Sequence, residues 1–160
     1  MLHINLICVG KLKESYFKDA FAEYQKRLSK YCRFSVTEIP DEKIPENLND
    51  SLIAEIKQKE CKKILENLKK GTYVISLDLT GNQYSSEDFS KKIEALSLHQ
   101  ISSITFIIGG SLGLNEEVLS FSNEKICFSK MTFPHQLIRI FLIEQLFRSF
   151  KISKGETYHR

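Results

Sequence analysis

Three short stretches at the ends of predicted strands carry residue types that could bind a ligand. They are Leu77-Asp78-Leu79-Thr80-Gly81, the glycine-rich stretch Ile108 to Gly113, and Phe128-Ser129-Lys130-Met131-Thr132-Phe133. Glycines let the backbone approach a ligand closely, because no Cβ intervenes. Aromatic and thioether side chains suit an adenine ring or an apolar methyl–sulfur group. Together the stretches predict a nucleotide-like ligand, although each one alone also fits a packed turn.

Several familiar motifs are absent from the sequence. The glycines are spaced Gly109-Gly110-x-x-Gly113 after a late strand, whereas a dinucleotide-binding fold places G-x-G-x-x-G after its first strand. The chain contains no G-x-x-x-x-G-K-[ST] phosphate loop and no G-x-S-x-G nucleophile elbow with a plausible triad. A nicotinamide dehydrogenase is therefore disfavoured, though it stays an alternative.

The last predicted helix, from Pro134 to about Phe150, is apolar around most of its circumference. Its apolar residues are Leu137, Ile138, Ile140, Phe141, Leu142, Ile143, Leu146, Phe147 and Phe150. A helix that is hydrophobic on all sides needs partners on several sides. We therefore expect a homodimer built on this helix, with burial inside one chain as the alternative. His135, near the helix start, should have a lowered pKa and be neutral.

A basic tail, 151–160, ends in Tyr158-His159-Arg160. An aromatic ring, an imidazole and a guanidinium can together stack on a base and hold a phosphate. Between Lys130 and Arg160 there are six Lys or Arg residues and two acids, although the net charge of the whole chain is only +3. This distribution favours a polyanionic partner, while a solvated chain end is the alternative.

Composition indicates one ordinary globular domain. The chain has 160 residues, of which 42% are hydrophobic and 27% charged. Its four cysteines form no C-x-x-C pair, so buried free thiols in a reducing cytosol are expected. The histidines are scattered, and no apolar run approaches the ~20 residues of a membrane span. We expect no metal, no signal peptide and no membrane span.

Predicted strands and helices alternate along the chain. Strands are expected at 4–9, 34–39, 73–79, 104–108 and 126–128, the third followed by a turn at 80–82. Helices are expected between them, with Ser85 and Asn115 as caps of the third and fourth. The strands are continuous apolar runs, which favours a mainly parallel sheet covered by helices on both faces. The predicted fold class is a single α/β domain.

These motifs together resemble those of the bacterial 23S rRNA pseudouridine-N3 methyltransferases, in the SPOUT class of RNA methyltransferases. The resemblance covers essentially the full length. It rests on 9–13, 38–40, 77–78, 107–110, 113–114, 129–135, Arg139, 144–148 and the closing Tyr158-His159-Arg160. The blocks FSKMTFPHQ and Tyr-His-Arg are its most specific parts.

This resemblance implies features that the pattern of residues did not show. The family has a trefoil knot near its C-terminus, an exception to usual chain topology, and binds S-adenosylmethionine there in a bent conformation. The expected cofactor contacts in this chain are Leu77, Gly109, Phe128, Ser129, Lys130, Met131, Thr132 and Phe133. The family is homodimeric, and the tail 151–160 is expected to complete the partner's active site.

The resemblance also implies a reaction, methylation of N3 of a pseudouridine in 23S rRNA on the assembled ribosome in the cytoplasm. His159 is the first candidate to assist proton loss, Tyr158 would stack on or orient the base, and Arg160 would hold phosphate or stabilise negative charge. His135 is a weaker candidate. The alternatives are another SPOUT activity, such as ribose 2′-O-methylation of tRNA or rRNA, and a non-catalytic ribosome-binding module.

Overall fold

The structure is a computed structural model that describes residues 1–158. Five strands and five helices alternate in this part of the chain, as the sequence predicts. The elements are β1 His3–Val9, α1 Ser15–Leu28, β2 Arg33–Ile39, α2 Asp50–Glu66, β3 Tyr73–Asn82, α3 Ser86–Leu98, β4 Ser103–Ile108, α4 Glu116–Phe121, β5 Glu124–Ile126 and α5 His135–Ser153.

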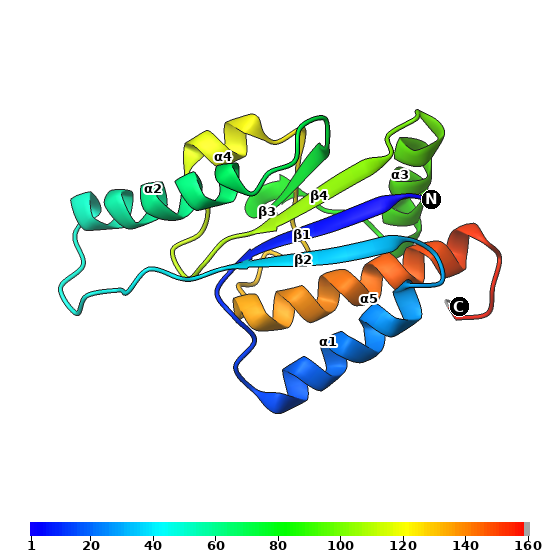
Figure 1. Ribbon diagram of the computed structural model, residues 1–160, viewed down its shortest axis with the longest axis horizontal. Helices are drawn as coiled ribbons and strands as arrows, with labels where there is room; N and C mark the ends of the chain where they lie inside the picture. The colour runs from blue at the N-terminus through cyan, green and yellow to red at the C-terminus, as the bar shows by residue number, and fades with distance from the viewer. Residues whose placement is uncertain (159–160) are drawn as a thin grey trace.

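The strands form one parallel sheet in the order β2-β1-β4-β3-β5. The predicted fold class, a single α/β domain with a parallel sheet flanked by helices, is confirmed. Because all strands run the same way, their carboxyl ends meet at one edge of the sheet, and ligands in such sheets bind beyond that edge. Figure 1 shows β1, β2 and β4 side by side, with the N-terminus at the opposite edge.

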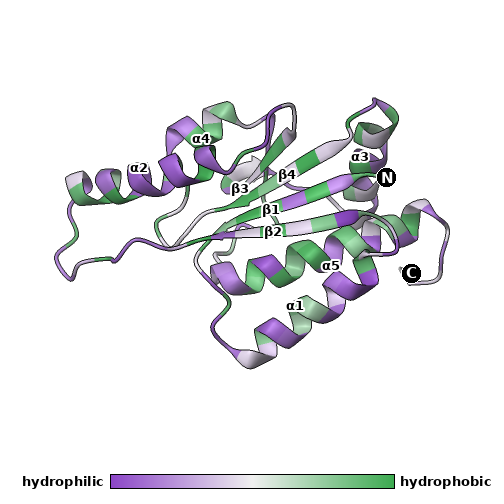
Figure 2. Ribbon diagram, in the orientation of Figure 1, coloured by the Kyte–Doolittle hydropathy of each residue, from purple (hydrophilic) through white to green (hydrophobic). Residues whose placement is uncertain are grey.

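Helices cover both faces of the sheet, and each face has its own core. The helices α1, α3 and α5 pack on one face, over alternate strand residues such as Leu6 and Phe106. On the other face α2 and α4 cover Ile7 and Ile107. Figure 1 shows α2 and α4 on one side of the sheet and α1 and α5 on the other. Figure 2 shows hydrophobic residues along the whole of α5, whereas α2 is mostly hydrophilic.

Side-chain caps fix where three of the helices begin. The Oγ of Ser85 accepts a hydrogen bond from the backbone N–H of Asp88, and the Oδ1 of Asn115 accepts one from that of Val118. Both caps were predicted from sequence and are confirmed. Asn49 caps α2 in the same way, through the N–H of Leu52. Each cap satisfies a backbone donor that the first turn of a helix leaves without a partner.

The predicted turn at 80–82 is wrong, because β3 continues through it to Asn82. After an irregularity, Asn82 pairs with Ile126 of β5, to which Leu77 also pairs. Gly81 permits this return: a Cβ there would lie 2.5–2.7 Å from the Ile126 backbone. Contact with a strand more than 40 residues away thus overrides the turn propensity of Thr80-Gly81-Asn82.

Two further boundaries differ from the predictions. The strand predicted at 126–128 is β5, Glu124–Ile126, and Cys127 and Phe128 lie beyond it. The last helix runs three residues past Phe150, to Ser153. Phe150 stacks on Tyr31, with ring centroids 5.6 Å apart, and this contact anchors the final turn.

All four cysteines are free and buried, as predicted. Burial raises the pKa of the thiols of Cys8 and Cys32 to about 12 in each case. Thiols in such apolar surroundings are unreactive.

Candidate functional site

A cavity of about 820 Å³ opens at the carboxyl edge of the sheet. The three stretches that the sequence singled out all border it, although they are far apart along the chain. Its lining consists of Lys57, Leu77–Thr80, Ile108–Leu114, Ile126–Ser129, Met131–His135 and Ile138. The parallel topology brings these strand ends together.

The loop that follows β4, residues 109–114, is shaped by its backbone. The N–H of Gly113 donates to the carbonyl oxygen of Gly110 at 3.0 Å, and Gly113 has a positive φ of 78°. A Cβ on Gly109 would lie 2.9 Å from the carbonyl carbon of Gly113 and 3.1 Å from the side chain of Leu114. The loop therefore accepts only glycine at 109, and a ligand can approach the bare backbone there.

The segment that follows β5, residues 127–133, is built differently. The Sγ of Cys127 donates to the carbonyl oxygen of Ser129 at 2.8 Å, and the Oγ of Ser129 accepts from the N–H of Met131 at 3.0 Å. These bonds fold the segment back on itself. Met131 is 72% exposed at the cavity. Its flexible thioether is available to a ligand and is not part of the core.

The end of β3 adds polar groups to the cavity. The carboxylate of Asp78 accepts hydrogen bonds from the backbone N–H and the hydroxyl of Thr80. Lys57 reaches the cavity from α2, the helix that precedes β3 in the chain. The cavity therefore combines apolar walls with one carboxylate and one ammonium group.

A buried arginine fixes the start of α5 beside the cavity. The guanidinium of Arg139, only 1% exposed, donates to Glu38 at 2.7 Å and to the carbonyl oxygen of Gly10 at 2.9 Å. One turn earlier, the ring of His135 lies so close to Gly10 that a Cβ there would be 3.0 Å from its Cε1. Burial, and then the charge of Arg139, lower the pKa of His135. The sequence predicted this direction, but from the helix N-terminus.

Comparison with known proteins identifies the family. Residues 2–159 match the family described as "Predicted SPOUT methyltransferase". The chain is 54% identical, over 99% of its own length and 100% of the relative's, to "Ribosomal RNA large subunit methyltransferase H" of Clostridium acetobutylicum. It is 52% identical, with the same coverage, to "Ribosomal RNA large subunit methyltransferase H 1" of Clostridium perfringens strain SM101. The chain belongs to the SPOUT methyltransferase family.

A solved structure shares the fold at much lower identity. It is that of a probable methylase family protein from Haemophilus influenzae Rd KW20, with a TM-score of 0.54 and 12% identity. The alignment covers 99% of this chain and 70% of that one. This arrangement of strands and helices is therefore found where little sequence similarity remains.

SPOUT methyltransferases use S-adenosylmethionine, and the residues of the cavity suit that molecule. A volume of about 820 Å³ lies within the ~300–1,000 Å³ of small-molecule sites. The bare backbone at Gly109 gives room for close approach, and Phe128, Met131 and Phe133 offer apolar and aromatic surface. Asp78 supplies a negative charge for a cationic sulfonium or ammonium group.

Seven of the eight predicted cofactor contacts line this SPOUT cavity. They are Leu77, Gly109, Phe128, Ser129, Met131, Thr132 and Phe133. Lys130 is exposed and is not among the lining residues. Sequence reasoning placed neither Lys57 nor Ile138 at the cavity, because each lies on a helix that only tertiary packing brings there.

Of the predicted catalytic residues 158–160, the structure describes only Tyr158, and Tyr158 does not line the cavity of its own chain. Tyr158 packs edge-on against Phe147, with centroids 4.9 Å apart, and lies under the guanidinium of Arg148. Its hydroxyl donates to Glu144 at 3.1 Å, and burial is the main cause of its raised pKa. Residues 159 and 160, the predicted His159 and Arg160, lie outside the described residues.

The described part of the chain has neither a metal-binding cluster nor a membrane-spanning helix. Within 1–158, no group of three or more His, Cys, Asp or Glu side chains is placed to hold a metal ion. In the same range, no helix has both the length and the apolar character needed to cross a membrane.

Proposed function

We propose that this protein transfers a methyl group from S-adenosylmethionine to N3 of a pseudouridine in 23S ribosomal RNA, on the assembled ribosome in the cytoplasm. The observation that carries the proposal is full-length identity of 54% to a ribosomal RNA large subunit methyltransferase H, in a chain whose three strand-end stretches line one cavity. The choice of N3 and of pseudouridine rests on the resemblance of the FSKMTFPHQ block and the Tyr-His-Arg ending.

The cofactor, when bound, supplies a methyl group activated on a cationic sulfur with a neutral thioether as its leaving group. Because the methyl group is already activated, the main task of the cavity residues is to position it against the target nitrogen. The backbone of Gly109 would lie against the cofactor, while Phe128, Met131 and Phe133 exclude water from around it. Asp78 would hold a positively charged part of the molecule.

The target nitrogen must lose its proton, and the tail residues are the proposed helpers. His159 would accept the proton directly or through water, Tyr158 would orient the base, and Arg160 would hold phosphate or stabilise charge on the ring. His135 is the weaker candidate. Its lowered pKa keeps it neutral and able to accept a proton near pH 7.

We further propose a homodimer through α5 in which the tail of each chain completes the partner's site. Two observations support this arrangement. Tyr158 lies against Phe147 and Glu144 and lines no part of the cavity of its own chain. Leu137 and Ile140 of α5 are only partly buried in the single chain, so apolar surface of this helix remains uncovered. The trefoil knot is proposed on the same family grounds, for the chain that passes from β5 to α5.

The decisive experiment is methyl transfer to ribosomes that lack the modification. Purified protein is incubated with radiolabelled S-adenosylmethionine and ribosomes from a strain lacking the enzyme, and the labelled nucleoside is then identified. Label in N3-methylpseudouridine of the large-subunit RNA is the expected result. Label in a ribose 2′-O-methyl nucleoside, or in no RNA while the cofactor still binds, would overturn the proposed reaction.

A further inference from the structure

A second cavity, of about 320 Å³, lies directly beside the large one. The two cavities share a wall made of Ile126–Ser129 and Phe133. The remaining lining of the small cavity consists of Tyr84, Ser85, Ser86, Phe89, Phe141, Glu144 and Gln145. A group held in the small cavity would therefore lie next to the cofactor cavity, at the residues that line both.

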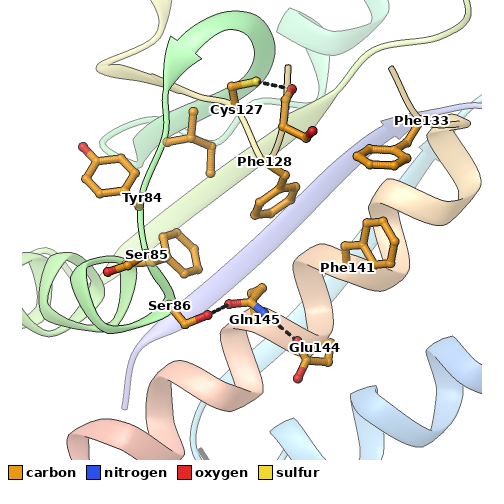
Figure 3. Close-up of a pocket in the computed structure, with 12 residues that line it drawn as sticks. Tyr84, Ser85, Ser86, Cys127, Phe128, Phe133, Phe141, Glu144 and Gln145 are labelled. Carbon is orange, nitrogen blue, oxygen red and sulfur yellow. Dashed lines mark hydrogen bonds between the residues drawn. The ribbon is translucent and has the colours of Figure 1, made fainter. Parts of the chain in front are cut away.

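The walls of the small cavity are aromatic. Figure 3 shows Phe128, Phe133, Phe141 and Tyr84 around one space. Phe133 and Phe141 are held edge to face, with centroids 5.6 Å apart and planes at 88°. Aromatic faces of this kind stack on nucleic-acid bases, and enzymes that modify a base flip it out of the RNA to reach it. A volume of about 320 Å³ has room for a single pyrimidine ring.

One side of this cavity carries an amide whose orientation is fixed. The Oγ of Ser86 donates to Oε1 of Gln145 at 2.7 Å, and Nε2 of Gln145 donates to Glu144 at 2.8 Å (Figure 3). Glu144 is in turn held by Arg148. Each bond leaves capacity unused, because the amide oxygen has a second lone pair and the amide nitrogen a second hydrogen.

An amide in a fixed orientation can recognise a base edge that has one N–H beside one carbonyl. Pseudouridine is attached to ribose through carbon, so its N1 keeps a hydrogen next to the O2 carbonyl, whereas N1 of uridine carries the ribose. Bonds from N1–H to Oε1 and from Nε2–H to O2 would leave N3 free. Recognition of an N–H group discriminates strongly, since a base without it leaves a polar group unpaired.

From this geometry we infer that the small cavity holds the pseudouridine that is to be methylated, and that Gln145 reads its N1–H and O2 edge. This inference rests on the proposed function and adds a specificity-determining residue to it. Gln145 distinguishes pseudouridine from uridine, and the aromatic wall holds the ring. N3 points to the border between the two cavities, where the cofactor's methyl group would have to lie for in-line transfer.

The test measures substrate preference with full-length protein and intact ribosomes. Two preparations are used, one carrying pseudouridine at the target and one from a strain that leaves uridine there. Wild-type protein should prefer the first preparation. Gln145→Leu should raise KM for the pseudouridine ribosomes by about tenfold and reduce the preference, because both base contacts are lost. Ser86→Ala, which frees the amide, should give a smaller loss in the same direction.

A control and two further measurements separate the possible outcomes. Gln136→Leu changes a glutamine of the same helix that lines neither cavity, and should leave KM and preference unchanged. The affinity of Gln145→Leu for S-adenosylmethionine, measured by calorimetry, should equal that of the wild type. Wild-type preference and KM in folded Gln145→Leu, or no preference in the wild-type protein, would overturn the inference.

Two other results have distinct meanings. Failure of the wild-type protein to methylate either preparation would count against the proposed function itself. Dissociation of a wild-type dimer by Gln145→Leu, seen by sedimentation, would overturn the inference and assign the small cavity to the subunit interface. The variant Phe141→Leu keeps the amide and removes one aromatic wall, and should raise KM for both preparations while the preference persists.

Discussion

The glycine loop 109–114 and the segment 127–133 both line the large cavity but are constructed in opposite ways. In the glycine loop, shape comes from the backbone: Gly109 is buried, and a Cβ would collide with the chain itself. In the segment 127–133, shape comes from hydrogen bonds made by side chains, and Met131 and Thr132 are exposed. The glycine loop is thus fixed by close backbone packing, whereas the segment 127–133 is held by its own side-chain hydrogen bonds.

This difference separates stability from binding within one site. A change in the glycine loop should disturb the sheet end and α4 together, because Leu114 belongs to the core beneath α2 and α4. A change in the exposed part of the segment 127–133 should leave the core intact and alter only what the cavity holds. The four predictions below test that separation, from the largest expected effect to the smallest.

Gly109→Val should lower the free energy of unfolding by roughly 3 kcal/mol, because the new side chain has no space beside the Gly113 backbone. Urea denaturation measures the change. Ser111→Ala, an exposed position in the same loop, is the matched control and should change stability by less than about 0.5 kcal/mol. Equal stability of the two variants would mean that the glycine loop tolerates substitution as well as the segment 127–133 does.

Met131→Ala should weaken binding of S-adenosylmethionine about fivefold, because it removes apolar surface that the ligand would cover. Its stability should stay within about 0.5 kcal/mol of the wild type, since the side chain is 72% exposed. Calorimetry and urea denaturation give the two values. Leu98→Ala removes an apolar side chain of similar exposure outside the cavity and should affect neither. A large stability loss in Met131→Ala alone would contradict the comparison.

Ser129→Ala should weaken cofactor binding about threefold, because the N–H of Met131 loses its acceptor and the segment is held less firmly. Ser129→Thr keeps a hydroxyl and should restore most of the affinity. If both variants bind equally weakly, a hydroxyl at position 129 is not sufficient for tight binding, and the hydrogen bond to Met131 is not what matters.

His135 should titrate below its ordinary pKa of 6.5, as burial and Arg139 both disfavour its charged form. The unfolded chain then binds more protons just below pH 6.5, so the free energy of unfolding should fall as the pH drops through that window. NMR titration gives the pKa, and His135→Asn should lose this part of the pH dependence. A histidine pKa at its ordinary value would show that this end of the wall is open to water, and one above it would show that the charge of Asp41 outweighs burial.

The fold, and the position of the cavity at the carboxyl edge of the sheet, follow from local patterns in the sequence. Continuous apolar strands predict the parallel sheet, and the residues after Leu77, Ile108 and Phe128 are then bound to meet at one edge, as they do. Helix caps such as Ser85 can be predicted from sequence, because a hydroxyl followed three residues later by an acid is a local signal.

What the sequence did not reveal depends on contacts between distant elements. β3 continues through Gly81 because Ile126 lies beside it, and no local pattern contains that pairing. Lys57 reaches the cavity only because α2 crosses that end of the sheet. The fixed amide of Gln145 requires Ser86 of α3, 59 residues away, so the small cavity could not be predicted from either helix alone.

The four buried thiols have a practical consequence. Cys8, Cys32 and Cys61 are closed to a water-soluble alkylating reagent in the folded molecule, so their modification can proceed only while part of the structure is open. Cys127 adjoins both cavities, whereas Cys8 and Cys32 lie in the core on the α1, α3 and α5 face of the sheet. The alkylation rate of Cys127 would therefore report on opening of the cavity wall, and the rates of Cys8 and Cys32 on opening of the core. Measuring these rates with and without a ligand would separate the two motions.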